Sequence, residues 1–280
     1  MIRVIHISDF HLETTVLNDW EKFTKKALIK TINAQQPQCS VSDTFILCTG
    51  DMINKAGNSY GGVLNALNRF NETVIQPVLE ETGLSLDHFI LLPGNHEVDR
   101  RADDDIHAEG LRAMIEKKGQ SLINEYTRSL MDGDYKDSKR ISEYNDFIAE
   151  LYKDLDNIQI SPLGVTFTYD TSEGKLGVAA FNTVWNAYDH DDLTRGLAIG
   201  EPQYQFCKDN LEDCDIKIAA MHHPLDSLKF EKATIQNWVY SDFQFLYIGH
   251  IHETDSFYKS TVYGSLLVNV SPSYTADIRS

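Results

Sequence analysis

The chain has 280 residues, of which 42% are hydrophobic and 24% are charged, and its formal net charge is -17. This length and composition are those of a folded domain with a sizeable core, and they exclude a disordered or fibrous chain. The negative charge disfavours a nucleic-acid partner, because binding to the phosphate backbone draws its affinity from Lys and Arg. A small anionic ligand is easier to reconcile with this charge, and nucleic acid is only disfavoured, because any bound divalent ions would add local positive charge that the formal count omits.

The cysteine pattern and the start of the chain point to a cytoplasmic protein. Cys39, Cys48, Cys207 and Cys214 form no C-x-x-C pair and no framework spacing, so neither a zinc knuckle nor a disulfide scaffold is indicated. Strand-like sequence begins directly after Met1, and no apolar run approaches the length of a membrane span. We therefore expect a reducing compartment and no membrane partner.

Six short apolar runs predict buried strands. They lie at residues 3–8, 44–49, 88–92, 175–181, 216–221 and 243–248, and a final strand is expected at 261–270. Two segments with apolar residues at helical spacing, within residues 17–28 and 63–78, separate the first three strands. Strand and helix therefore alternate, which predicts a layered α/β fold.

The pattern changes between residues 103 and 156. Two polar stretches with helical spacing flank a turn-like segment at residues 131–134. We interpret this region as a helical insertion that packs on the main domain, within one domain spanning residues 1–280. A solvent-exposed helical hairpin remains the alternative.

A polar cluster follows each of five predicted strands. In chain order the clusters are Asp9 with His11, Asp51, Asn95 with His96 and Glu97, His222 with His223, and His250 with His252. In layered α/β sheets, the loops after the strands converge at one edge, which is where ligands bind. We therefore expect the five clusters to form one site.

The residue types in these clusters favour a metal centre. Side chains two positions apart on a strand point to the same face, so Asp9 with His11 and His250 with His252 can each offer two ligands. A mixture of carboxylate, imidazole and amide oxygen suits borderline divalent ions such as manganese, iron, zinc or cobalt. The first two clusters are weak signals alone and the third and fifth are stronger, but all five in this order, each ending a buried run, predict a metal site.

In this order the clusters resemble the calcineurin-like metallophosphoesterases, whose pattern is D-x-H, G-D, G-N-H-D/E, a lone His and G-H-x-H. The resemblance covers residues 9–252. It implies a four-layer α-β-β-α sandwich of two mixed sheets. It also implies a binuclear metal centre and the hydrolysis of phosphate esters.

Carried over position by position, the resemblance implies two sets of metal ligands. One ion would be bound by Asp9, His11, Asp51 and His252, and the other by Asp51, Asn95, His222 and His250, with Asp51 bridging the two. Mn²⁺ or iron, as Fe²⁺ or Fe³⁺, is the expected metal, with Zn²⁺, Co²⁺ or Ni²⁺ as alternatives.

The same resemblance implies a mechanism. Two such ions, about 3.5 to 4 Å apart, supply a bridging hydroxide that attacks the phosphorus atom. Asp51 and His96 are the expected catalytic residues, with His96 as the general acid that protonates the leaving group. Asn95 and His223 are expected to contact the substrate.

The residues after His96 leave two alternatives open. Glu97 and Asp99 either orient His96 or are solvated loop residues. Arg100 and Arg101 either touch a substrate phosphate or pair with the acidic run at residues 103–105.

The motif details favour a phosphodiesterase within the family. The phosphoprotein phosphatases extend the second motif as G-D-x-V-D-R-G, whereas this chain has Asn54 and Lys55 in place of the Asp and Arg. The first and third motifs look like those of the cyclic nucleotide phosphodiesterase branch. A nuclease acting on DNA or RNA is the alternative, and the catalytic part of a longer protein and a non-catalytic interaction module are further hypotheses.

Overall fold

In the computed structural model, which describes residues 1–35, 39–133, 139–188, 192–251 and 255–270, the first three apolar runs form a small parallel sheet. Its strands are, in spatial order, β1 (Arg3–Ile7), β2 (Thr44–Cys48) and β3 (Phe89–Leu91). Ile5 pairs with Ile46, and Leu47 pairs with Ile90. Every residue of β2 is buried, as expected for a central strand covered on both faces. Because the strands are parallel, the loops that follow them lie at one edge.

The later runs form a larger sheet of seven strands. In spatial order these are β4 (Ile158–Ile160), β5 (Gly164–Thr171), β6 (Gly174–Phe181), β7 (Ile216–Met221), β8 (Phe245–Ile248), β10 (Ser265–Val270) and β9 (Asp255–Ser260). Strands β6, β7, β8 and β10 run parallel, while β4, β5 and β9 pair antiparallel with their neighbours. The large sheet is therefore mixed, as predicted. The small sheet, which was also expected to be mixed, has only parallel pairs among its described strands.

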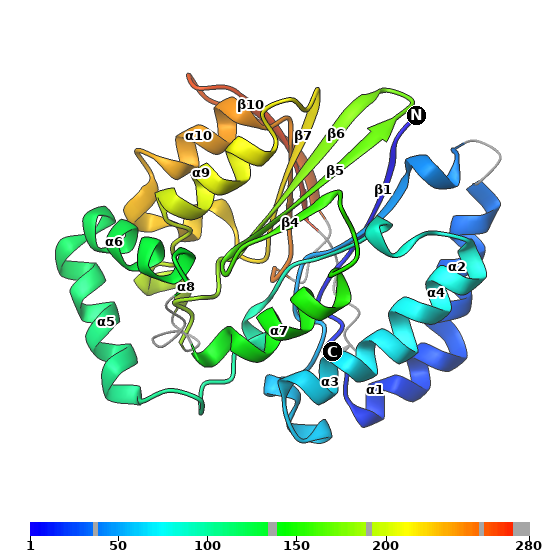
Figure 1. Cartoon of the computed structure of the whole chain (residues 1–280), viewed down its shortest axis with the longest axis horizontal. Coiled ribbons are helices and arrows are strands. Elements are labelled where there is room, and N and C mark those ends of the chain that lie inside the picture. The colour runs from blue at the N-terminus through cyan, green and yellow to red at the C-terminus, as the bar shows by residue number, and fades with distance from the viewer. Residues whose placement is uncertain (36–38, 134–138, 189–191, 252–254, 271–280) are drawn as a thin grey trace.

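The helices cluster beside one sheet or the other. Their bounds are α1 (Thr14–Asp19), α2 (Lys25–Gln35), α3 (Val63–Phe70), α4 (Gln76–Thr82), α5 (Asp105–Lys118), α6 (Gln120–Met131), α7 (Ser142–Leu151), α8 (Asp192–Arg195), α9 (Glu201–Asn210) and α10 (Ile235–Asp242). Helix α3 shows why they pack, because Val63, Ala66, Leu67 and Phe70 fall on one face and are all buried. In Figure 1, α1 to α4 lie outside the small sheet and α9 and α10 lie outside the large one.

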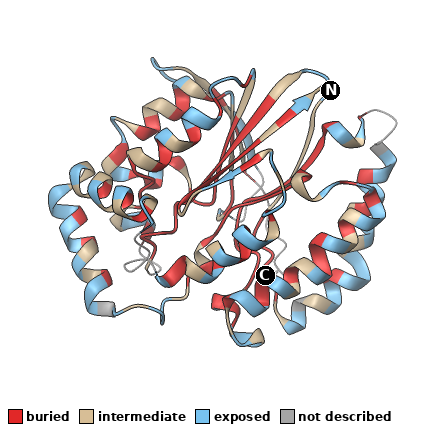
Figure 2. Ribbon diagram, viewed as in Figure 1, coloured by how far each residue is buried: buried red, intermediate tan, exposed pale blue. Residues whose placement is uncertain are grey.

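The two sheets face each other across a shared core. Along β6, Val178 and Ala180 pack with the small sheet, whereas Ala179 and Phe181 pack with the helices on the opposite side. This alternation follows from the two-residue period of a strand. Figure 2 shows buried residues along both sheets and exposed residues on the outer faces of the helices. The expected sandwich of two sheets between helical layers is confirmed.

The predicted strands before residue 250 are all present, but the C-terminal one is different. Of the predicted strand at residues 261–270, only residues 265–270 form one, β10, because residues 261–264 make the turn that joins β10 to β9, a strand that was not anticipated. Strands β4 and β5 were not anticipated, although Val165, Phe167 and Tyr169 carry the two-residue period of a half-buried strand.

The insertion packs against the rest of the chain. Its first helical stretch is split by Gly119, whose φ of 62° ends α5 and begins α6. Arg112 of α5 forms a 3.1 Å ion pair with Asp192 of α8, and its guanidinium lies 5.1 Å from the centre of the Tyr188 ring. These contacts favour the packed insertion over the exposed hairpin.

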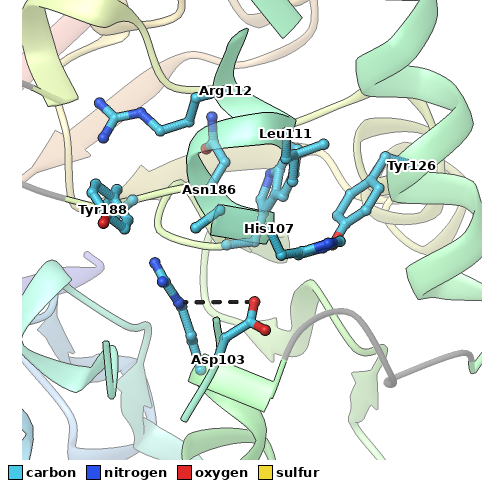
Figure 3. A pocket seen from close by; sticks show the side chains of 11 residues that line it. Asp103, His107, Leu111, Arg112, Tyr126, Asn186 and Tyr188 are labelled. Atoms are coloured by element: carbon cyan, nitrogen blue, oxygen red, sulfur yellow. Dashed lines mark ion pairs between the residues drawn. The ribbon is translucent and has the colours of Figure 1, made fainter. Parts of the chain in front are cut away.

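Figure 3 shows the small cavity left at this junction, between α5 and the segment that carries Asn186 and Tyr188. The dashed line joins Asp103 to Arg140, whose Nε lies 4.0 Å from the carboxylate. The cavity volume is about 20 Å³, which is room for about one water molecule.

Two further expectations concern the cysteines and the membrane. All four cysteines are buried thiols, and none forms a disulfide. Among the described residues, no helix has the length and apolarity needed to cross a bilayer.

Candidate metal centre

The polar clusters meet where the two sheets approach each other. Asp9, Asp51 and Asn95 follow the strands of the small sheet, and His222 and His250 follow β7 and β8 of the large one. The His250 amide donates a hydrogen bond to Asp9 Oδ2 at 3.3 Å, across 241 positions of sequence. His11 also lies here, with its Nε2 3.8 Å from Asp51 Oδ2, so the fold brings six of the seven predicted ligands to one place. His252 lies outside the described residues.

The backbone at the centre is held in an unusual conformation. Asp9, His11, Asp51 and His250 have positive φ angles of 55°, 46°, 52° and 66°. Such angles are uncommon for residues other than glycine and cost free energy, so they persist only where surrounding contacts enforce them. Here the His11 amide donates to the Asp51 carbonyl at 2.9 Å, and the Asp9 amide donates to the Gly50 carbonyl at 3.0 Å. Four of the six described non-glycine residues with positive φ are thus predicted metal ligands.

Asp51 lies at the middle of the cluster. Its Oδ1 accepts a hydrogen bond from the His96 amide at 2.9 Å, while its Oδ2 lies 3.4 Å from His222 Nε2 and 3.8 Å from His11 Nε2. Burial opposes the charge on this carboxylate, but the facing imidazoles, first that of His222, hold its pKa well below the usual range. Asp51 is thus an ionised side chain placed between two groups of imidazoles.

His222, His250 and Asn95 form a tight group of donor atoms. Asn95 Oδ1 lies 3.1 Å from both His222 Nε2 and His250 Nδ1, and these two nitrogens are 3.2 Å apart. The His222 ring also contacts the Thr49 carbonyl oxygen through Nδ1 at 2.7 Å. Because a carbonyl only accepts, Nδ1 must carry a proton, and in the neutral ring Nε2 presents a lone pair to its neighbours.

The donor chemistry of the group fits a cation. Without one, burial alone would lower the pKa of His222, but the Asp51 carboxylate raises it to about 9, so a proton is drawn to the ring. A divalent ion would replace that proton, because lone pairs of imidazole, amide and carboxylate then all face it. Within the described residues, Asp9, Asp51 and His222 have ligand atoms within 4.8 Å of one another, as do His11, Asp51 and His96. The residues therefore fit a metal site.

His96 lies beside His11, with 4.4 Å between the ring centres. Its Nδ1 is 3.1 Å from the Lys55 amide, which donates to it, and 3.1 Å from Asn54 Oδ1. Burial is the main cause that lowers the pKa of His96 to about 4, and the positive charge of Arg100 acts in the same direction. A neutral ring that accepts at Nδ1 carries its proton on Nε2, which makes that atom a hydrogen-bond donor.

Glu97 is the functional residue that the sequence reasoning underrated. Its buried carboxylate accepts hydrogen bonds from the amides of Asp51 at 2.9 Å, Ile53 at 3.0 Å and Gly94 at 2.6 Å. Burial and the Asp51 charge raise the pKa of Glu97 to about 8, whereas the amide donors favour the ionised form, as bound cations would. Glu97 therefore ties together the loops that carry Asp51 and Asn95. Because its observed hydrogen bonds go to these loop amides, Glu97 positions the two loops rather than the His96 ring.

His223 is buried next to the ligand group. Its Nδ1 lies 2.9 Å from Thr183 Oγ1, and its ring centre is 4.7 Å from that of His250. Burial lowers the pKa of His223 well below its ordinary value, so the ring is neutral. The sequence analysis did not predict Thr183 as a site residue. Its position, two residues after the end of β6, could have indicated it, because the other site residues also directly follow strands.

One comparison with known proteins identifies the family. A model of the calcineurin-like phosphoesterase family matches residues 2–254 of the chain, a range that includes every motif position. None of the curated proteins compared with the chain matches it.

Two solved structures are similar at low identity. The phosphopantetheinyl hydrolase PptH from Mycobacterium tuberculosis is 11% identical with a TM-score of 0.42, over 97% of this chain and 90% of that one. The Thermus thermophilus sulfate thiohydrolase SoxB is 12% identical with a TM-score of 0.45, over 96% of this chain and 51% of that one. The chain thus spans about half the length of SoxB.

Removing the Glu97 carboxylate should destabilise the protein. Glu97→Ala leaves three buried amides without their acceptor, and we expect the free energy of unfolding in urea to fall by roughly 3 kcal/mol or more. The control is Glu150→Ala on α7, an exposed residue paired with Lys153, which should change stability by less than about 1 kcal/mol. Equal effects of the two variants would contradict the role assigned to Glu97.

The close approach of two loops gives a second prediction. A Cβ atom added at Gly94 would collide with the side chain and amide of Asp51, whereas one at Gly110 in α5 would meet nothing within 4 Å. Gly94→Ala should therefore lower both the melting temperature and the bound metal measured by elemental analysis. Gly110→Ala should keep its metal and gain up to about 1 kcal/mol from helix propensity. Full metal loading of Gly94→Ala would show that Asp51 tolerates displacement.

Proposed function

Because the chain belongs to the calcineurin-like phosphoesterase family, which implies metal-dependent hydrolysis of phosphoric esters, we propose that it hydrolyses a small phosphodiester, such as a cyclic or other small nucleotide. The observation that carries the proposal is the convergence of Asp9, Asp51, Asn95, His222 and His250 from two sheets. The four buried thiols favour a reducing compartment, so the proposal places the enzyme in the cytoplasm.

The proposed ligand sets are those expected from the motifs. Asp9, His11, Asp51 and His252 would hold one ion, and Asp51, Asn95, His222 and His250 would hold the other. The position of Asp51 Oδ2 near both His11 and His222 supports its role as the bridge. The mixture of oxygen and nitrogen donors suits Mn²⁺ or iron. When bound, two such ions lower the pKa of a water molecule and neutralise charge on the phosphoryl group.

The chain's own residues then orient the substrate and move a proton. His96 presents Nε2–H to the oxygen of the leaving alcohol, because Nδ1 is engaged by the Lys55 amide. An anionic phosphodiester beside the ring favours its charged form and raises its pKa toward neutrality. Asn54 supports the charged form, because its oxygen lies 3.1 Å from His96 Nδ1 and can accept from a proton there, while its own amide nitrogen donates to Glu13 at 3.1 Å. Asn95 and His223 complete the wall that faces the substrate.

Neutralising the bridging carboxylate should abolish activity. In Asp51→Asn one carboxylate oxygen becomes an amide nitrogen, which cannot bind a cation, so both ions should be held more weakly. We expect fewer than two ions per chain by elemental analysis and no hydrolysis of bis(p-nitrophenyl) phosphate with Mn²⁺. The control is Asp226→Asn, whose exposed carboxylate is 3.6 Å from Lys259. Two ions and full turnover in Asp51→Asn would exclude a binuclear centre at this residue.

Replacing His96 should slow catalysis without removing metal. General acid catalysis is typically worth about 10² to 10⁴ in rate, so His96→Ala should lower kcat by that amount for a diester with an alkoxide leaving group. The loss should be smaller for a nitrophenolate, which departs without a proton. Equal losses on both substrates would instead assign His96 to stabilising phosphoryl charge, and lost metal would make it a ligand.

A further inference from the structure

Strand β9 leaves one edge of the large sheet open. It is the last strand in the spatial order of the sheet, and it pairs with β10 on its inner side. In the described part of the chain, no strand pairs with its outer side. Such an edge presents unpaired backbone groups and is a template for a further strand. Proteins usually keep these edges very short or charged, but β9 is six residues long and contains two adjacent aromatic residues.

Large apolar side chains are exposed at the same edge. Phe257 is 40% exposed and Tyr258 is 70% exposed, and Val262 and Tyr263 in the turn that follows are 94% and 54% exposed. All four belong to the hairpin of β9 and β10. Grouped apolar side chains on a surface mark interaction sites more often than single ones do. The hairpin therefore combines an open backbone edge with apolar side chains, which together suit recognition by strand addition.

The backbone groups of β9 alternate between the inner and the outer side. The Thr261 amide donates to the Gly264 carbonyl at 2.8 Å, so Thr261 faces β10. Successive residues of an antiparallel strand face opposite sides, so the amides of Ser256 and Tyr258 face the open edge. The Ser256 amide is consistent with this, because it donates to the Asp255 side chain at 2.8 Å. An incoming strand would therefore bond to Ser256 and Tyr258.

Charge favours a second copy of the chain as the incoming strand. When two β9 strands pair antiparallel about a two-fold axis, the alternation allows an axis at Phe257 or at Tyr258 near the middle of the strand. With the axis at Phe257, Asp255 of each copy lies directly opposite Lys259 of the other. With the axis at Tyr258, Lys259 lies opposite Phe257 and no opposite charges meet. Opposite charges in directly facing positions stabilise a strand pair, so the axis at Phe257 is favoured.

Both charged side chains can reach a partner at the surface. Lys259 Nζ lies 3.6 Å from Asp226 Oδ1, but this carboxylate is exposed, and exposed ion pairs contribute little. Asp255 makes its bond to the Ser256 amide at the open edge itself. The net charge of -17 opposes self-association at long range. An interface between two copies therefore needs opposite charges near its centre, and this register supplies them.

We propose that two copies of the chain associate through the outer edges of β9, antiparallel about a two-fold axis at Phe257. The large sheet then continues from one copy into the other. Ser256 exchanges backbone hydrogen bonds with Tyr258 of the second copy, and Phe257 packs against its own equivalent. Asp255 pairs with Lys259 across the axis on both sides. The inference does not depend on the proposed function, because no residue of β9 is a predicted metal ligand.

Sedimentation equilibrium of the full chain over a series of concentrations tests the association. We expect the mass to rise with concentration from 31.8 kDa toward twice that value. Tyr258→Pro should abolish the rise, because it removes an amide that faces the open edge but none that bonds to β10. The matched control is Ile160→Pro on β4, at the opposite edge of the same sheet, which should keep the dimer. A monomer at every concentration would overturn the proposal and leave the edge to a strand of another protein.

Exchanging the two charges tests the register. Asp255→Lys alone and Lys259→Asp alone should each raise the Kd of the dimer by about tenfold, because like charges then face each other. The double variant Asp255→Lys/Lys259→Asp restores opposite charges and should recover the affinity. Lys153→Asp, at an exposed lysine paired with Glu150 at 2.7 Å, is the control that should leave Kd unchanged. Single variants without effect, or a double variant as weak as either single one, would contradict the axis at Phe257.

A cross-link locates the axis directly. In the proposed register the two copies of residue 257 form a non-hydrogen-bonded pair, with Cα atoms about 4.5 Å apart, which is within the range of a disulfide. Mild oxidation of Phe257→Cys should therefore give a covalent dimer, whereas the four native cysteines are buried. Val262→Cys, in the exposed turn away from the axis, is the control and should cross-link far less. Equal cross-linking of the two variants would indicate random collision and count against the interface.

Discussion

Three backbone amides from two loops converge on the carboxylate of Glu97, and the geometry of the whole centre depends on these hydrogen bonds. The loop after β2 carries Asp51, and the loop after β3 carries Asn95 and His96. Each loop has buried backbone amides that need a hydrogen-bond acceptor, and neither loop would be stable in this conformation without one. A single buried acceptor satisfies both loops and fixes them relative to each other. Asp51 is thereby held where imidazoles from the other sheet can reach it.

The backbone at the predicted ligands is strained, and this strain also fixes the geometry of the centre. Asp9, His11, Asp51 and His250 adopt left-handed conformations that Asp and His tolerate better than most residues. The rigid strands on either side enforce these angles, and the close contact between Gly94 and Asp51 leaves no room for relaxation. The backbone thus fixes the directions in which these side chains leave the chain, which would reduce the reorganisation that metal binding requires. Lys55 and Ala56, in the loop beside His96, share this strained conformation.

Local patterns in the sequence predicted much of the fold and the neighbourhood of the site. Buried runs such as residues 44–49 identify strands because their burial is encoded in consecutive residues, and the polar clusters follow from the geometry of strand ends. The ligand roles of Asp9, Asn95 and the other motif residues stay predictions. What local patterns could not give is contact between distant loops, such as the bond from Ile53 to Glu97 or a cavity that Lys55 and Arg100 both line. The turn between β9 and β10 was missed because Gly264 alone is a weak break in an apolar run.

The long separation between the donors has a consequence for biosynthesis. Asp9 and His250 lie 241 positions apart, and a chain grows on the ribosome by about 5 to 20 residues per second. Roughly 12 to 50 s therefore pass between the synthesis of the first donor and that of His250. During this interval the nascent chain holds the carboxylates of Asp9 and Asp51 before the imidazole of His250 exists, so it can offer only part of the proposed coordination shell. With the proposed ligands, metal capture would be a late event that follows the docking of the second sheet on the first.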